Sequence, residues 1–400
     1  MKRNTIIRFL LCTTLLTWGN GAISGGTDIV QSGSNSGDVT VTTSITGVGD
    51  LGQAASSSIS ATGALVSVGV SGVNADFDRN SLGVGLLEMD STNSGVISGT
   101  GSISFDTGAT SIGDAGSIAV GTSGATTAMS MKGVGAVAFS TPTMTGAGNQ
   151  DATNSAAVTG SGTITAGSVD LGGNAASASV SAIGAASAFS VSGIGASSFG
   201  GATFGNDVTS ASQTVSNDGT AANVLNSGSS ISLAAMTGDA SSASIVAKGA
   251  SASVSLSTIA TTAASGMDVG TLTQTVNNAT TSGNSGTVGI TGGTIDVTGD
   301  VSGVAASVSI AASGATASYS LTSVSDTAYT VTEITPSVAG AAMPLTQTVT
   351  NGALGDVSVG SSSSITLGGS DLGVNSSASI SAVGAGGYVT FSASGPAATP

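Results

Sequence analysis

The densest group of metal-binding side chain types in the sequence is the segment DFDRN at residues 76–80. Oxygen-bearing residues at alternate positions resemble the start of a calcium loop, because calcium takes hard oxygen ligands. A helix-flanked calcium loop also requires glycine at its sixth position and glutamate at its twelfth, where this chain has Ser81 and Leu87. We therefore interpret Asp76, Asp78 and Asn80 as a polar turn between repeats, with a calcium site as the alternative.

A second set of carboxylates recurs along the chain, each one ahead of a run in which small apolar and hydroxyl residues alternate. The set is Asp50, Asp114, Asp170, Asp239, Asp300 and Asp371. One carboxylate per repeat is fewer than the six to eight oxygen ligands that calcium takes, unless other groups complete the site. Aspartate beside small residues is a common turn signal. We interpret the set as turn residues, with a column of calcium sites as the alternative.

Asparagine recurs with the same period, as the last residue of a Gln-x-x-x-Asn pattern. The pattern occurs at 31/35, 150/154, 213/217, 274/278 and 347/351, and a degenerate copy has Met89 in place of glutamine ahead of Asn93. Amide side chains stacked at one position of a β-structure can form a ladder, whereas asparagine is also frequent in turns. Both interpretations remain open for Asn154, Asn217, Asn278 and Asn351.

These in-phase markers predict six repeats of about sixty residues, which is the period expected of a repeat architecture. The repeats start near residues 31, 89, 150, 213, 274 and 347. Alternation with period two predicts β-strands. We expect about four short strands per repeat: the Gln/Asn segment, a short strand led by glycine, the alternating run, and a further run after a hinge glycine such as Gly184. No segment beyond the N-terminus has helical periodicity.

The fold class that follows is all-β. The 400-residue chain contains 62 glycines and only 3% aromatic residues, so its core must consist of small side chains that bury little area each. Tightly stacked sheets suit such a core, because each repeat then buries its apolar face against its neighbours. We expect a stacked β-solenoid or β-arch architecture over residues 23–395, followed by a frayed tail at 396–400. A repeated β-sandwich or a propeller is the alternative.

The first 22 residues have the features of a secretory signal peptide. Lys2, Arg3 and Arg8 supply a positive region, the apolar run FLLCTTLLTW follows at 9–18, and small residues lead up to Ala22. The apolar run is too short to cross a bilayer as a helix. We therefore expect a secreted protein located outside the cell or on its surface.

The composition leaves few residues for catalysis. The sequence has no histidine, and its one cysteine, Cys12, lies in the expected signal peptide. Neither a Ser-His-Asp nor a Cys-His arrangement can therefore form, and we expect no enzymatic activity, no small-molecule substrate and no cofactor apart from the calcium alternative. The 21 acidic residues outnumber the 6 basic ones, which argues against nucleic-acid binding because that function needs basic patches.

The leader, the in-phase Gly/Ser/Ala/Thr-rich repeats and the low charge together look like the secreted β-repeat proteins of prokaryotic cell surfaces. Sheath, surface-layer and matrix-fibre subunits belong to this group, among them the sheath subunits of filamentous methanogens. The resemblance covers the chain after residue 22 and rests on composition and repeat style. It implies an extracellular structural role, and no functional residue is transferred from it.

The expected function is therefore that of a structural protein which assembles edge to edge with copies of itself on the cell envelope, as a sheath, surface layer or amyloid-like fibre. Soluble β-proteins protect their edge strands with lysine, proline and inward charges, and only 7% of this chain is charged, with 5 prolines. The alternative is an adhesin that displays loops from the β-repeat scaffold, in particular the proline-containing insertion at 326–345.

Overall fold

The computed structural model describes most of the repeat region. The described residues are 13–15, 27–47, 50–51, 56–73, 83–105, 111–113, 116–134, 139–140, 143–144, 148–173, 176–194, 199–200, 203–204, 210–239, 241–259, 264–265, 268–269, 271–281, 283–304, 306–324, 337–338, 341–342, 345–369, 372–373 and 376–394. Within them the chain is all-β: strands and their connections occur, and no helix does. No helix suited to crossing a membrane is found in these residues either.

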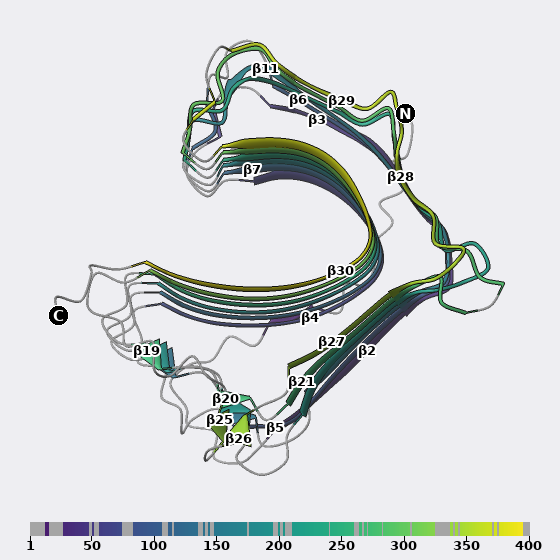
Figure 1. Ribbon diagram of the computed structural model, residues 1–400, viewed down its shortest axis with the longest axis vertical. Helices are drawn as coiled ribbons and strands as arrows, with labels where there is room; N and C mark the ends of the chain where they lie inside the picture. The colour runs from purple at the N-terminus through teal and green to yellow at the C-terminus, as the bar shows by residue number, and fades with distance from the viewer. Residues whose placement is uncertain are drawn as a thin grey trace, which may run out of the picture.

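Three parallel sheets make up the body of the molecule, and each is built by successive repeats (Figure 1). The first, here called the long sheet, contains the 18-residue strands. Its members, in spatial order, are β1 (Thr13–Leu15), β4 (Ser56–Val73), β7 (Ser117–Val134), β12 (Ser177–Ile194), β18 (Ser242–Ile259), β24 (Ser307–Val324) and β30 (Ser377–Ser394). Chain order and spatial order coincide, so the repeats stack one after another.

The Gln/Asn segments form the second sheet, here called the amide sheet. Its main strands are β2 (Thr27–Asn35), β5 (Gly83–Asn93), β10 (Gly148–Asn154), β15 (Ser210–Asn217), β21 (Thr271–Asn278) and β27 (Leu345–Asn351), and it is extended by the two-residue strands β9 (Thr143–Met144), β14 (Thr203–Phe204) and β20 (Asp268–Val269). The Gln and Asn positions of successive repeats pair in register throughout.

The third sheet comes from the glycine-led segments. It contains β3 (Val39–Gly47), β6 (Ile97–Phe105) and β11 (Val158–Asp170), and then three pairs of shorter strands: β16 (Val224–Ser227) with β17 (Ser230–Ala235), β22 (Val288–Thr291) with β23 (Thr294–Val297), and β28 (Val357–Val359) with β29 (Ser364–Leu367). Gly228 and Gly292 have positive φ values of 63° and 67° between the paired strands, a conformation that glycine adopts readily.

Two smaller sheets complete the described structure. One is parallel and contains β8 (Phe139–Ser140), β13 (Phe199–Gly200) and β19 (Ala264–Ser265). The other is an antiparallel hairpin of β25 (Ser337–Val338) and β26 (Ala341–Ala342), inside the insertion of the fifth repeat. Every other strand pair is parallel.

The prediction that a hinge glycine separates two strands is wrong. Gly184 lies inside β12, which is one continuous 18-residue strand. Alternation is nevertheless interrupted there: Ala182 and Ala185 are both buried, three positions apart instead of two. The strand thus bends and changes the face that it buries, and the long sheet curves as a whole (Figure 1).

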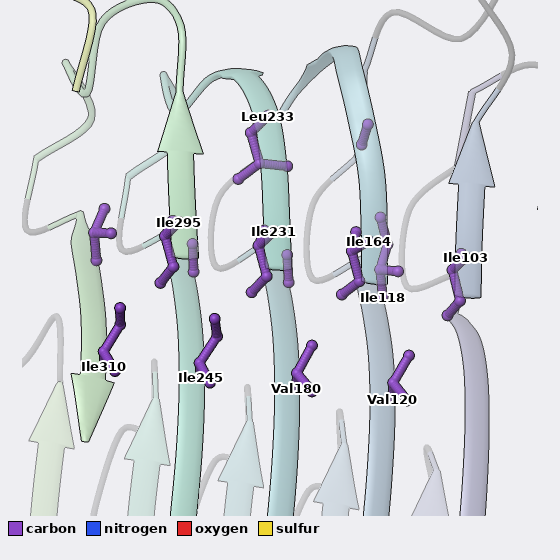
Figure 2. Packing of buried hydrophobic residues seen from close by; sticks show 14 of the residues in the cluster. Ile103, Ile118, Val120, Ile164, Val180, Ile231, Leu233, Ile245, Ile295 and Ile310 are labelled. Carbon is purple, nitrogen blue, oxygen red and sulfur yellow. The ribbon is translucent and has the colours of Figure 1, made fainter. Parts of the chain in front are cut away.

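The two halves of each long strand bury their side chains against different sheets. The first half packs against the third sheet in the larger core, where Val180 and Ile245 lie with Ile164, Ile231 and similar residues. Figure 2 shows these side chains in rows that run from strand to strand. The second half packs against the amide sheet in a smaller core lined mainly by alanine and valine. Small side chains suit this arrangement because they let neighbouring sheets approach closely.

Candidate functional site

The Asn side chains of successive repeats form one continuous hydrogen-bonded ladder along the amide sheet. Asn154 Nδ2 donates to Asn217 Oδ1, and Asn217 Nδ2 donates to Asn278 Oδ1, both at 2.7 Å. The same 2.7 Å bond joins Asn35 to Asn93, Asn93 to Asn154, and Asn278 to Asn351. A stacked amide column of this kind is how cross-β structures satisfy polar side chains between sheets.

Each ladder amide uses its second N–H to hold the turn that leads into the third sheet. Asn93 donates to Gly95 O at 2.8 Å, and Asn154 donates to Ala156 O at 2.7 Å. Asn217 and Asn278 bond Ala222 O and Gly286 O in the same way, both at 2.8 Å. The four central asparagines are fully buried. Since a buried amide must be bonded, the ladder fixes the corner between two sheets in every repeat.

The recurring glycine of the long strands lies against this ladder. A Cβ atom on Gly184 would lie 2.3 Å from Asn217 Oδ1 and 2.5 Å from Gly249 O. Gly63, Gly124, Gly249 and Gly314 meet the next asparagine and the next glycine in the same way. Only a residue without Cβ leaves room for the amide. The two markers that recur in the sequence, asparagine and glycine, are therefore the two halves of one packing contact.

A second amide ladder runs beside the first in the opposite direction. Gln213 Nε2 donates to Gln150 Oε1 at 2.9 Å, so each glutamine donates to the preceding repeat, as Gln274 and Gln347 also do at 2.8 Å. The same nitrogens bond backbone carbonyls of the long strands, for example Ser253 O from Gln213 at 3.1 Å. At Met89 this ladder changes, because Gln150 Nε2 there meets the thioether sulfur at 3.7 Å.

The recurring aspartates act as connectors between repeats. Asp50, Asp170 and Asp239 each accept a hydrogen bond from a backbone N–H of the following repeat, at 3.0, 3.0 and 2.8 Å. They do not stack on one another: Asp170 pairs with Ser111 through an isolated bridge on one side and with Ala235 of β17 on the other. This is the geometry of turn residues and differs from a carboxylate column. Asp300 closes a similar turn through its carbonyl, which accepts from Met236 N at 2.9 Å.

The remaining metal candidates lie outside the described residues. These are Asp76, Asp78 and Asn80 of the calcium-like segment, together with Asp114 and Asp371. Among the residues that the structure does describe, no group of three or more carboxylate, histidine or cysteine side chains is placed to hold a metal ion.

One polar cluster had no distinguishing signal in the sequence. Asp218 accepts hydrogen bonds from Thr280 Oγ1 at 2.9 Å, Thr281 N at 3.0 Å and Asn284 Nδ2 at 3.0 Å. Burial acts to raise the pKa of Asp218, but the bonds from Thr281, Asn284 and Thr280 outweigh it and lower that pKa. The cluster joins turns of adjacent repeats.

The last coil of the stacked sheets differs from the interior in the exposure of its apolar side chains. Ile310 and Val254, inside the long sheet, are 0% and 2% exposed, whereas Ile380 and Val389 on the last strand are 48% and 47% exposed. These end residues occupy the same columns as the buried ones. At the other end, Ile59 and Val68 of β4 are only 6% exposed each, and Val30 of β2, which is 60% exposed, belongs to an outward column that continues in Glu88. Apolar positions that the inner repeats cover are therefore uncovered at the last coil, which makes its strands the candidate functional surface.

Comparison with known proteins adds no family to this description: no protein-family model, curated protein or solved structure matches the chain.

Proposed function

We propose that this protein is a structural subunit that assembles with copies of itself, edge to edge, into an extracellular sheath, surface layer or amyloid-like fibre. Its partners are then other copies of the chain and the cell envelope. The resemblance to secreted prokaryotic β-repeat proteins supports a location at the cell surface, as does the signal-peptide pattern of residues 1–22.

As a finer description of the fold, we propose a β-solenoid in which each repeat is one coil. Every repeat contributes strands to the amide sheet, then the third sheet, then the long sheet, and the next repeat continues in the same order. The in-register pairing of like residues from coil to coil supports this architecture. A solenoid has two ends at which the coil pattern simply stops, and those ends need a cap or a partner.

The observation that carries the proposed function is the character of the end strands. β27, β28, β29 and β30 contain no charged residue and no proline. At the opposite end β3 has none either, whereas β2 contains Asp28. Edges of this kind are templates for pairing with another chain, which soluble proteins normally avoid. Hence the last coil is suited to association as it stands, and the first coil becomes suited to it once β1 no longer pairs with β4.

Sequence chemistry supports a non-enzymatic role. The chain has no histidine and a single cysteine within the expected leader. The amides buried in the structure are bonded to one another and to the backbone, so they serve to hold coils together.

The direct test is assembly of the purified protein. The chain, expressed with its own N-terminal segment so that any processing takes place, is concentrated and followed by sedimentation and negative-stain electron microscopy, with and without calcium. We expect regular polymers with a parallel β-sheet spacing of about 4.7–4.9 Å in diffraction. A chain that remains monomeric at high concentration in both conditions contradicts the proposal.

An adhesin is the second candidate, because the insertion in repeat five carries the one antiparallel hairpin among the described strands, β25 with β26. A hairpin that departs from the parallel sheets can present a loop to a partner. Deleting residues 326–345 should then abolish adhesion to surfaces while the circular dichroism spectrum is retained. Unchanged adhesion after this deletion excludes that role.

A further inference from the structure

We propose that copies of this chain join head to tail, so that the last coil of one copy stacks on the first coil of the next and the Asn ladder runs unbroken through the junction. This inference rests on the proposed function, because it specifies the partner surface and the polarity of the assembly. The occupant of each end is a second copy of the chain, and the reasons lie in how the two ends complement one another.

The Asn ladder ends in a hydrogen-bond donor at the last coil and a hydrogen-bond acceptor at the first coil, and these two groups can bond to each other across a junction between copies. Asn351, in the last coil, donates one N–H to Gly355 O at 2.6 Å, and no described residue accepts its second N–H. Asn35, in the first coil, uses its nitrogen to donate to Gly37 O and to Asn93 Oδ1, and no described residue donates to its oxygen. Within the chain this donor and this acceptor always meet, at 2.7 Å. A second copy supplies the missing contact at both ends.

Gly384 shows that the last coil keeps the matching space. In the inner coils a Cβ on the equivalent glycine would lie 2.3–2.5 Å from the next asparagine oxygen. On Gly384, by contrast, a Cβ would meet only Asn351 Nδ2, at 3.6 Å, among the described atoms. The last coil therefore needs no glycine for its own packing. The last coil does need a glycine at 384 if Asn35 of a second copy packs against it, in the way that Asn351 packs against Gly314 within the chain.

Apolar side chains at the last coil fit the same partner. Ile380 continues the column of Ile59, Val120, Val180, Ile245 and Ile310. Ile59 begins that column, so stacking places Ile59 of the second copy over Ile380, and Val68 over Val389 in the same way. Ile59 and Val68 are each 6% exposed within one copy, and β1 pairs at Val68, so the cover on this edge must leave before the second copy docks. Burying the half-exposed side chains of Ile380 and Val389 releases water from apolar surface, which favours association.

The backbone edges also match. β30 has the same length as β4, and every inner pair of these strands is parallel and in register. In the third sheet the junction would bring the split strands β28 and β29 against the continuous β3, an arrangement that already exists between β16 and β17 and the continuous β11. The short strand β1 pairs with Ser67–Gly69 of β4, so it must leave this edge before a second copy docks.

A contact between two different surfaces, repeated by translation, does not close and produces an open fibre. Head-to-tail joining thus predicts polar fibres one molecule wide, with growth at coil ends. Lateral assembly through the outer faces of the sheets predicts instead that end substitutions have no effect.

Gly384→Ala tests the junction directly. The added methyl group fits within one copy but would overlap Asn35 Oδ1 of the next, so we expect loss of sedimentable polymer with the monomer's circular dichroism spectrum unchanged. Gly360→Ala is the matched control: its Cβ would face Ile290 O of the preceding coil at 3.4 Å, away from the free end. This control should assemble like the wild type.

A mixing experiment separates a blocked end from a misfolded chain. Gly384→Ala keeps an intact first coil, so it should add to the end of a wild-type fibre and stop its growth. We expect substoichiometric amounts of Gly384→Ala to shorten wild-type fibres, whereas Gly360→Ala should not. A misfolded variant has no first coil to dock and would leave fibre length unchanged.

An asparagine substitution provides an independent readout. Asn351→Asp retains an acceptor for Asn278 Nδ2 but loses its own bond to Gly355 O and the donor for a second copy, so assembly should be lost. An unchanged circular dichroism spectrum of the monomer shows that the last coil remains folded without the bond to Gly355. If Gly384→Ala and Asn351→Asp both assemble as the wild type does, head-to-tail joining is overturned while the proposed function stands. A wild-type chain that stays monomeric overturns the proposed function itself.

Discussion

Replacing one asparagine of the ladder should cost far more stability than replacing its neighbour on the same strand. Asn278 and Asn277 are adjacent in β21 but face opposite sides of the amide sheet. Asn278 is fully buried, and Asn277 is half-buried. The column through Asn277 also contains Ser216 and Thr350, so that position accepts other side chains. We therefore compare Asn278→Ala with Asn277→Ala.

The expected cost follows from the bonds that Asn278 makes. Its nitrogen donates to Gly286 O at 2.8 Å and Asn351 Oδ1 at 2.7 Å, and its oxygen accepts from Asn217 Nδ2 at 2.7 Å. A buried group left without its partner costs about 1–3 kcal/mol. Because Asn351 is partly exposed and can bond water instead, we expect the free energy of unfolding to fall by about 3–5 kcal/mol in total. For Asn277→Ala we expect a change of about 0.5 kcal/mol or less.

Guanidinium denaturation followed by circular dichroism measures this difference, with an expected midpoint shift on the order of 1 M for Asn278→Ala. Hydrogen exchange then locates the damage: protection should fall first in β21 and β27, since repeat proteins open locally. If the two variants unfold at the same denaturant concentration, the ladder contributes nothing to stability and our reasoning about the Asn column is refuted.

Three further predictions concern single positions. Gly184→Ala should destabilise the fold by about 1–3 kcal/mol through overpacking, whereas Gly69→Ala, where a Cβ meets no described atom within 4 Å, should be neutral in the same thermal melt. The hydrogen bonds that lower the pKa of Asp218 stabilise the fold at pH values above 3.8, the ordinary pKa of the group, and this stabilisation is lost as pH falls through the lowered pKa. Acid should therefore reduce amide protection at 279–285, as measured by hydrogen exchange. Asp218→Asn should remove that pH dependence. Burial lowers the pKa of Lys248, so the charge of this side chain opposes folding at neutral pH, and stability rises only as pH increases from the lowered pKa to 10.5. Lys248→Ile, which copies Ile183 in the same column, should therefore raise the melting temperature at pH 7. An unchanged melting temperature would contradict this.

Much of the architecture is predictable from the sequence because each repeat carries its own markers. The all-β class follows from period-two alternation in runs such as 177–183, and the repeats follow from the recurring Asn and Gly. The ladder itself could not be settled in advance. Asparagine is equally suited to a turn, and only the in-register pairing of β15 with β21 brings Asn217 and Asn278 together.

The course of the long strand could not be predicted from local pattern. Ala182 and Ala185 are both buried, so the period-two alternation is broken between them. In the sequence this break looks like the end of a strand at Gly184. The strand continues because its two halves bury against different sheets, and that choice depends on contacts with residues tens of positions away. Likewise, the spacing of the aspartates does not show that Asp170 lies between Ser111 and Ala235, because insertions shift each turn.

The opposite directions of the two amide ladders have an electrostatic consequence. Each side-chain amide is a dipole, and along the Asn column all of them point one way, since every asparagine donates to the following coil. Along the Gln column they point the other way, since each glutamine donates to the preceding coil. The two sets oppose each other, coil by coil, from Gln213 onward. Adding coils or copies therefore accumulates little side-chain dipole along the stacking axis, whatever the length reached.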